Sequence, residues 1–182
     1  MRLAIFILLL AFVGCSKENK DPQEVIESKP LEISGNEIVN YMTYCNDRFD
    51  VCMIYPSNFN AQHEPANGDG RTFRNEIDSA EIVLFGFIDQ TNQGLQPQLD
   101  LYKEFLEIDS QTKIENGYEI LGQDLETGFK HKERIFIKPD TTAGTYADGT
   151  PMNIIYSLQF TYPVDKDKKY QKYWSKMIEK LK

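Results

Sequence analysis

The sequence contains little of what catalysis and metal binding most often require. Its 182 residues include two histidines, three cysteines and one tryptophan. Both histidines, His63 and His131, lie in polar surroundings, and no nucleophile elbow, zinc-protease helix motif, Walker motif or dinucleotide-binding glycine pattern accompanies them. A metal site would need more ligands than His63 has nearby. We therefore expect a protein that is not an enzyme and that holds no metal and no cofactor.

One catalytic alternative stays open on the sequence alone. Paired carboxylates are common in this acidic chain, as in Asp124 with Glu126 and Glu76 with Asp78. A hydrolase can use two carboxylates, and their separation in space, which the sequence does not give, decides whether they act together. The alternative to a non-catalytic protein is thus a small extracytoplasmic hydrolase that uses surface carboxylates.

Positive charge is scarce. Twenty lysines and arginines stand against 28 aspartates and glutamates, a formal charge of −8 at pH 7. Nucleic acids and anionic membrane surfaces are bound by clustered basic residues. We therefore expect no nucleic-acid partner, and membrane contact through an anchor only.

Long apolar runs are also rare, and the longest lies near the start of the chain. Residues 3–13 are all apolar, which is too short for a permanent membrane span but typical of a signal peptide. The run ends in Gly14-Cys15 and polar sequence follows at once, which resembles a bacterial lipoprotein box. The resemblance implies cleavage before Cys15 and lipidation of its thiol. An ordinary secretion signal with a cysteine nearby by chance is the alternative.

The lipoprotein interpretation divides the chain into three parts. Residues 1–14 are the expected signal peptide, residues 15–36 the lipidated cysteine and a flexible tether, and residues 37–182 a single globular domain. The tether is rich in charge and contains two prolines, so it cannot bury enough apolar surface to fold. Removal of Arg2 with the signal leaves 19 basic against 28 acidic residues, a formal charge of −9. The expected location is the bacterial cell envelope, with the lipid in the outer membrane.

The other two cysteines, Cys45 and Cys52, are separated by six residues. Outside the cytoplasm such a pair first indicates a disulfide. Two free buried thiols, or a redox or metal role, are the alternatives, although the C-x-x-C spacing of a redox pair is absent.

The pattern of apolar residues predicts an antiparallel sheet covered by helices, an α+β fold. Turn-forming clusters occur at residues 46–48 and at residues 67–70. Long polar loops are expected over 57–70 and 139–151. We expect strands over 41–45, 49–55, 71–74, 81–88, 118–121, 128–129, 134–137 and 153–162, and helices over 95–108 and in the final segment.

The final segment has the clearest helical pattern. Its apolar residues recur at helical spacing on one stripe, and lysines occupy the other side. The stripe comprises Tyr170, Tyr173, Trp174, Met177, Ile178 and Leu181. We expect it to pack on the sheet, while a basic amphipathic helix that binds a membrane or an acidic partner is the alternative.

Three blocks of sequence carry a resemblance to a known family. Residues 46–56 read N-x-R-F-x-V-C-x-x-Y-P, residues 65–73 read P-x-N-G-D-G-R-x-F, and residues 158–163 read L-x-F-x-Y-P. In this order they resemble PsbP-like and DcrB-like envelope proteins over residues 41–182. Asp50 stands where that pattern has glycine, and the cysteine pair is not part of it. The resemblance implies an α/β/α sandwich and leaves the chemistry open.

These observations favour a non-catalytic envelope lipoprotein that binds a protein or an envelope polymer through its sheet face or its long loops. Loops that carry glycine, asparagine and aspartate at their tips are common binding elements. The candidate binding residues on or next to these loops are Phe59, His63, Arg71, Tyr146 and Asp148.

Overall fold

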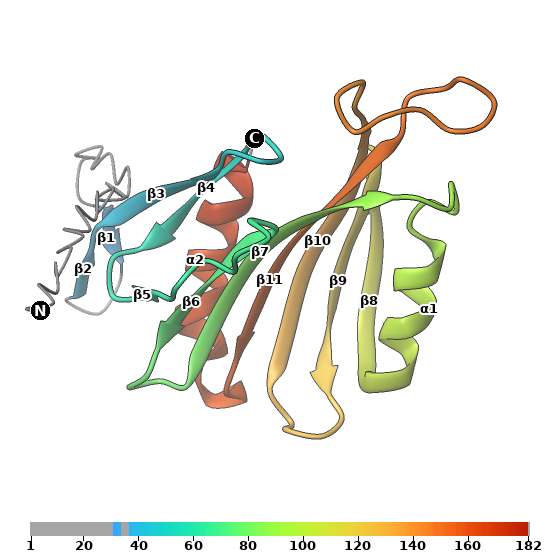
Figure 1. The fold of residues 1–182 in the computed structure, drawn as a ribbon. Coiled ribbons are helices and arrows are strands. Elements are labelled where there is room, and N and C mark those ends of the chain that lie inside the picture. Colours follow the sequence, from blue (N-terminus) through green and yellow to red (C-terminus); the bar gives the residue numbers. More distant parts are fainter. Residues whose placement is uncertain (1–30, 34–36, 182) are drawn as a thin grey trace, which may run out of the picture.

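The computed structural model describes residues 31–33 and 37–181 (Figure 1). The expected signal peptide and Cys15 lie outside the described residues, as does the expected tether apart from strand β1 (Leu31–Ile33), which pairs with β2 (Glu37–Val39). Within the described part of the chain, no helix has the length and apolar character needed to cross a membrane.

The fold is α+β, as the sequence predicts, and its centre is a seven-stranded antiparallel sheet. A separate hairpin and two helices pack on the sheet. The hairpin consists of β3 (Tyr41–Asn46) and β4 (Val51–Pro56), and the helices are α1 (Gln96–Phe105) and α2 (Asp167–Lys180), the latter preceded by a 3-10 turn over Val164–Lys166. In spatial order the strands are β5 (Asn60–Ala61), β6 (Gly70–Asn75), β7 (Ala80–Asp89), β11 (Asn153–Tyr162), β10 (Lys130–Pro139), β9 (Gly117–Asp124) and β8 (Leu106–Ile114).

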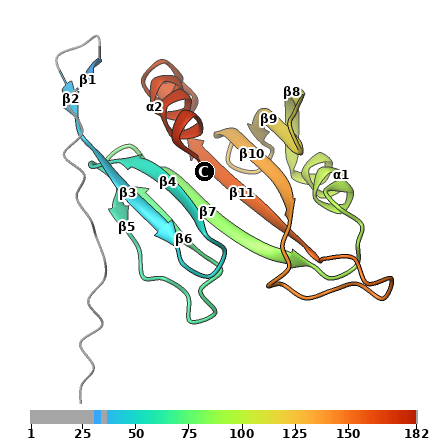
Figure 2. The ribbon, with the colours of Figure 1, turned by 90° about the horizontal axis from the view of Figure 1, so that it is seen from above.

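The two helices lie on opposite sides of the sheet (Figure 2). Successive side chains of a strand point to opposite faces, so each strand contributes to both sides. On β11, Tyr156 and Leu158 belong to the core beneath α2, and Ile155 belongs to the core beneath α1. We call these sides the α2 face and the α1 face.

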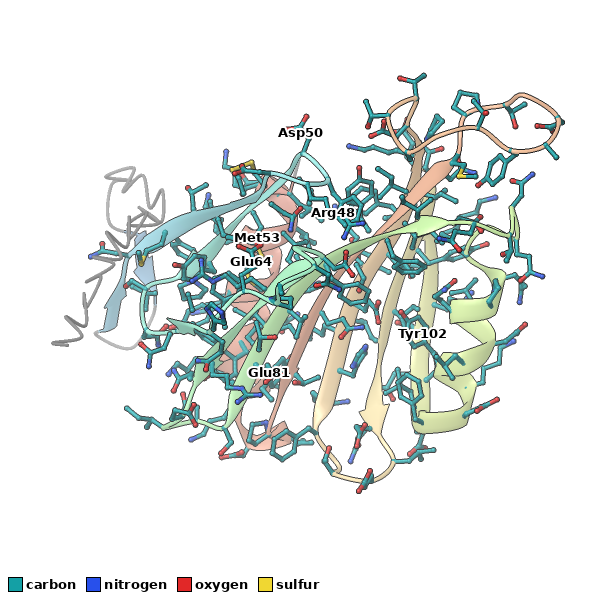
Figure 3. All side chains as sticks on the ribbon, viewed as in Figure 1. Arg48, Asp50, Met53, Glu64, Glu81 and Tyr102 are labelled. Atoms are coloured by element: carbon teal, nitrogen blue, oxygen red, sulfur yellow. A yellow bond between two sulfur atoms is a disulfide. The ribbon has the colours of Figure 1, made fainter. Side chains whose placement is uncertain are left out.

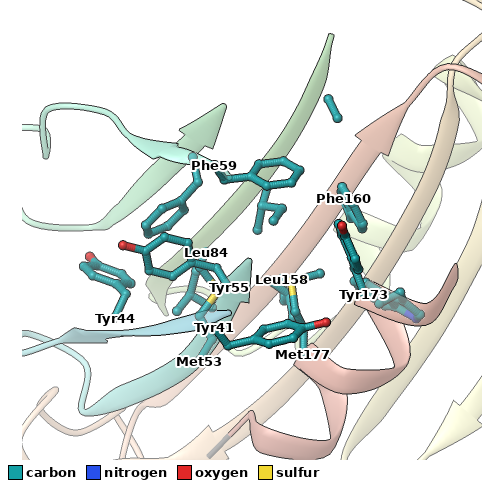
Figure 4. Packing of buried hydrophobic residues seen from close by; sticks show 14 of the residues in the cluster. Tyr41, Tyr44, Met53, Tyr55, Phe59, Leu84, Leu158, Phe160, Tyr173 and Met177 are labelled. Atoms are coloured by element: carbon teal, nitrogen blue, oxygen red, sulfur yellow. The ribbon is translucent and has the colours of Figure 1, made fainter. Parts of the chain in front are cut away.

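The α2 face carries the larger core, and much of it is aromatic (Figure 4). The β3–β4 hairpin and α2 together cover β6, β7 and β11 there. Tyr55 of the hairpin packs on Phe73 of β6 with ring centroids 4.3 Å apart, and Tyr170 of α2 packs on Phe160 of β11 at 5.1 Å. Tyr173, Trp174 and Met177 of α2 are also buried. The prediction that the final helix packs on the sheet is therefore confirmed.

The α1 face carries a smaller core at the other side of the sheet. Leu99 and Tyr102 of α1 pack with Ile120 of β9, Ile135 of β10 and Ile155 of β11. Pro97 fits the first turn of this helix because proline lacks the amide hydrogen that would be unpaired there. Helix α1 does not extend over β6 or the first part of β7 (Figure 2). Val83 and Phe85 on that side of β7 are therefore only half-buried, while Phe87, also half-buried, packs at the margin of the α1-face core.

Two local predictions are wrong. The helix expected over 95–108 ends at Phe105, and the chain turns directly into β8, which the sequence analysis missed. Leu106 and Ile108 fit a helical stripe, but both belong to the strand, where Leu106 lies opposite Asp124. The strand expected over 128–129 is instead part of the connection between β9 and β10, with Gly128 at a φ of +70°. Pairing with β9 decides both outcomes, and the local pattern does not contain it.

The disulfide expected between Cys45 and Cys52 is present. The two cysteines lie directly opposite each other in the β3–β4 pair, with their Cα atoms 4.1 Å apart. The bridge therefore joins the strands of the hairpin close to their connecting turn.

We predict that replacing both cysteines by serine lowers the free energy of unfolding by about 2 kcal/mol. The reason is that the closed loop restricts the unfolded chain more than the folded one. Denaturant unfolding of the variant and of the wild type measures the difference. Reductant should destabilise the wild type by the same amount and leave the double variant unchanged. Equal stability of both proteins without reductant would contradict the prediction.

Candidate functional site

The α1 face of β6 and β7 forms the floor of a hollow of about 330 Å³. Val83 and Phe85 of β7 and Thr72 of β6 lie on this floor. The wall comes from the loop between β5 and β6, which contributes His63 and Asn67 among others. We call this space the first hollow.

A second hollow of about 230 Å³ lies further along β7, at the start of α1. Phe87 and Asp89 of β7 line it, together with Pro97 and Gln98 of α1. Side chains two residues apart on a strand point to the same face, so both hollows open on the α1 face of β7.

A pair of aromatic rings connects the two hollows. Phe85 lines the first and Phe87 the second, and their rings are stacked with centroids 6.1 Å apart and an interplanar angle of 18°. From Val83 to Asp89 the strand advances by about 20 Å at the usual rise per residue. We call this surface, from the first hollow over the ring pair to the second, the open face. Its length suits an extended ligand better than a compact one.

The loop that walls the first hollow is held by polar side chains of the β3–β4 hairpin (Figure 3). Tyr44 Oη donates to Glu64 Oε1 at 2.7 Å, and Asn46 Nδ2 donates to the carbonyl of Gly68 at 2.8 Å. Arg48 forms an ion pair with Asp69. Burial, followed by the hydrogen bond to Glu64, raises the pKa of Tyr44, so its hydroxyl stays protonated and keeps donating. The wall is thus preformed.

The charged residues that line the first hollow are Arg71, Arg74 and Asp69, and they are engaged in contacts within the protein. Arg71 Nε donates to the carbonyl of Gln62 at 2.8 Å, and its guanidinium lies 5.8 Å from the centroid of the Tyr44 ring. Arg74 donates through Nε to Glu81 at 2.7 Å, and 52% of its side chain is exposed. Both arginines are held near the hollow by these contacts.

The second hollow is uncharged apart from Asp89, which is fully engaged by the backbone. Asp89 accepts hydrogen bonds from the amides of Thr91 at 3.2 Å and Gly94 at 2.8 Å, which fixes the turn that leads into α1. Tyr146 Oη donates to the carbonyl of Asp89 at 2.8 Å and so ties the loop over 140–152 to the end of β7. Side-chain amides, including that of Gln98, provide most of the remaining polar lining.

The five residues proposed from the sequence are dispersed. His63 and Arg71 both line the first hollow, and Tyr146 supports the rim of the second without lining it. Asp148 is exposed and accepts from the amide and the hydroxyl of Thr150 within its own loop. Phe59 is 2% exposed and packs against Phe160 and Tyr170 in the α2-face core. The structure thus brings only His63 and Arg71 together.

The residues of the open face that the sequence analysis missed are Val83, Phe85, Phe87 and Arg74. Both faces of the run over 81–88 are apolar, so the sequence does not distinguish a covered face from an open one. Only the position of α1 shows that the first part of one face carries no helix. One feature of the sequence points to the open face, namely two phenylalanines two residues apart on the same side of the strand. Such large aromatic side chains are unusual at strand positions that simply face solvent.

A separate polar network lies buried between α1 and the sheet. Glu133 of β10 is fully buried, and its Oε1 accepts from Tyr102 Oη, from Ser157 Oγ at 2.6 Å and from Gln159 Nε2 at 3.3 Å. His131 Nε2 lies 3.0 Å from Glu133 Oε2. Burial, and then the charge of Glu133, raises the pKa of Tyr102, which therefore remains a donor. The network fastens α1 to the sheet, with Tyr102 reaching from the helix (Figure 3).

One carboxylate of each pair considered for a hydrolase already accepts hydrogen bonds within the protein. Asp124 accepts from the amide and the hydroxyl of Thr127, and the backbone hydrogen bond is the main cause that lowers its pKa. Asp78 accepts from Lys169 Nζ at 2.8 Å and from Tyr170 Oη at 2.7 Å. In residues 31–33 and 37–181, no three histidines, cysteines or carboxylates are grouped as metal ligands would be.

We predict that Glu133→Ala lowers the free energy of unfolding by about 3–5 kcal/mol, because the buried donors around it lose their acceptor. Glu104→Ala, at an exposed position of α1, is the matched control and should change stability by at most about 0.5 kcal/mol. Chemical unfolding of the two variants gives the comparison. A loss at Glu133 no larger than the loss at Glu104 would show that the network does not fasten α1.

Comparison with known proteins adds no family to this geometry. No protein-family model matches the chain, and a search of curated proteins finds no match. The open face and the expected N-terminal anchor are therefore the basis for a proposal of function.

Proposed function

We propose that this protein is a non-catalytic lipoprotein of the bacterial cell envelope that binds an extended partner along its open face. The partner is a protein or an envelope polymer, and the membrane contact is the lipid on Cys15, with the outer membrane as its location. The observation that carries the proposal is the continuous surface of two hollows joined by the stacked rings of Phe85 and Phe87.

The chemistry of the open face supports binding. Half-buried aromatic rings can release water when a ligand covers them, and polar groups around them orient the ligand. The loop wall is held by Tyr44, Asn46 and Arg48, so little conformational entropy is lost on binding. The non-catalytic part of the proposal is supported by the carboxylates, because Asp124 accepts from Thr127 in its own turn and Asp78 accepts from Lys169 of α2.

The location is supported by features outside and inside the domain. The apolar run that ends at Gly14-Cys15 is typical of an exported lipoprotein. The Cys45–Cys52 disulfide fits an oxidising compartment, and the acidic composition gives no reason to expect a nucleic-acid partner. We further propose that residues 41–182 form a PsbP-like domain, with which the observed α+β architecture is compatible.

The anchor is tested by Cys15→Ser. We expect the variant to lose processing at the signal peptide, or to leave the membrane fraction, because a serine cannot carry the thioether-linked lipid. Cys45→Ser is the control, since it removes a cysteine without touching the anchor. Fractionation and intact mass measure both effects. Unchanged processing and membrane association of Cys15→Ser would contradict the anchor.

The open face is tested by photocrosslinking in cells with the full-length protein. We expect benzoylphenylalanine in place of Phe85 to form an adduct with envelope material, because this side chain lies at the centre of the open face. The matched control is the same replacement at Phe105 of α1, which is 36% exposed and lies outside both hollows. Adducts that are equal at the two positions, or absent at Phe85, would contradict binding at the open face.

A further inference from the structure

We propose that one end of the sheet rests on the lipid surface to which the protein is anchored, with four exposed apolar side chains entering that surface. We call this group, which consists of Ile77, Phe105, Leu125 and Val164, the apolar end. The inference rests on the proposed function, since it requires the lipid on Cys15 to hold the domain at the membrane.

Antiparallel pairing places four connections at the same end of the sheet, the lower end in Figure 1. They join β6 to β7, α1 to β8, β9 to β10, and β11 to α2. The register agrees, since Lys130 at the start of β10 lies opposite Gln123 near the end of β9 and opposite Tyr162 at the end of β11. One residue of the apolar end stands at each of the four connections.

The exposure of these side chains sets this end apart from the rest of the domain. Ile77 is 96% exposed, Leu125 61% and Val164 47%. Phe105 is 36% exposed, and Leu101, one helical turn earlier, continues the apolar surface along α1. These five are the exposed large apolar side chains of residues 31–33 and 37–181. The connections at the opposite end of the sheet carry none of them.

Hydrogen bonds fix the backbone that carries the apolar end. In the turn between β6 and β7, Asn75 Oδ1 accepts from the amide of Ile77 at 3.1 Å. The amide of Leu125 donates to the carbonyl of Phe105 at 3.0 Å, so these two residues lie side by side. The turns therefore hold their apolar side chains outward, away from the core.

A lipid surface suits this arrangement better than a protein groove does. The four residues are spread from β6 to β8, about 24 Å at the usual strand spacing. A rigid partner would need a separate pocket for each protruding side chain. A fluid bilayer interface admits all of them, and each one that enters removes apolar surface from water.

The proposed anchor brings this surface to the membrane. The described chain begins at Leu31, so residues 15–30 join the lipid to the domain. A segment of this length spans at most about 55 Å. The domain therefore stays close to the bilayer, and a contact that would be weak for a free protein is favoured by the high effective concentration.

The contact does not depend on charge. The scarcity of lysine and arginine led to the expectation that the anchor alone touches the membrane, and that argument concerns attraction to anionic lipid. Burial of apolar side chains in a zwitterionic interface is a separate effect. In this orientation β7 runs away from the membrane from Ala80 to Asp89, so the open face stands upright with the first hollow nearer the lipid.

The test asks whether a label at the apolar end enters lipid when the full-length protein is reconstituted in phosphatidylcholine vesicles. Ile77→Cys adds one reactive thiol, because Cys45 and Cys52 are bridged and the thiol of Cys15 carries the lipid in the proposed function. We expect a nitrobenzoxadiazole label on this thiol to lose emission with spin-labelled phospholipid and to resist quenching by iodide in water. Leu125→Cys, in a different turn, should give the same result and keeps the test valid if one variant fails to fold.

The matched control is Glu115→Cys, at an exposed position in the turn between β8 and β9 at the opposite end of the sheet. Its label should respond to iodide and not to spin-labelled phospholipid. Equal quenching by the phospholipid at both ends would overturn the inference. A label at the Ile77 position that neither quencher reaches would also overturn it, since a second copy of the protein would then cover this end.

Flotation of the vesicles separates this inference from the proposed function. Protein that floats with the vesicles, while its label at the Ile77 position stays open to iodide, rejects the apolar contact and leaves the anchor standing. Protein that does not float rejects the anchor and the apolar contact together.

Discussion

The structure depends on one constraint, which is that a seven-stranded sheet is wider than the elements available to cover it. Seven strands span about 29 Å at the usual spacing, whereas a helix with its side chains is about 10 Å wide. The chain places one helix on each face and adds the β3–β4 hairpin on the α2 face. These elements are staggered across the sheet, so that β11 is buried on both faces from Ile154 to Leu158. The two cores meet at this strand, and each half of the sheet keeps one face without a helix.

The α1 side of this arrangement relies on the buried polar network around Glu133. Helix α1 has only ten residues and buries two of them, Leu99 and Tyr102. Apolar contacts between α1 and the sheet are not directional, so they allow the helix several positions. The hydrogen bond from Tyr102 to Glu133 is directional and forms in one position of the helix. A buried carboxylate contributes specificity more than stability when all of its acceptor positions are used. This network therefore fixes the position of α1 through Tyr102.

The open face follows from where α1 stops. Its floor is the side of β7 that α1 leaves largely uncovered. The ring of Phe85 has no helix over it, and the ring of Phe87, stacked on it, packs at the margin of the α1-face core. The loop between β5 and β6 adds a polar wall only because Tyr44, Asn46 and Arg48 of the hairpin hold it from behind. The hairpin thus contributes apolar side chains to the α2-face core and polar side chains to the wall of the first hollow. The disulfide between β3 and β4 lies within the element that does both.

The features that depend on short-range patterns are predictable from the sequence. These are the alternation of β11, the amphipathic stripe of α2, the turn between Cys45 and Cys52, and through them the α+β class and the disulfide. It also contains the apolar run and Cys15, from which the anchor is inferred. Tertiary structure alone decided that Leu106 and Ile108 belong to a strand, because pairing with β9 outweighs the helical spacing of these residues. It also decided that Phe59 is core and that Phe85 lines a hollow. The sequence pattern of an apolar strand residue is the same whether its face is covered by a helix or open. The placement of α1 decides which of the two holds, and contacts between residues far apart in the chain fix that placement.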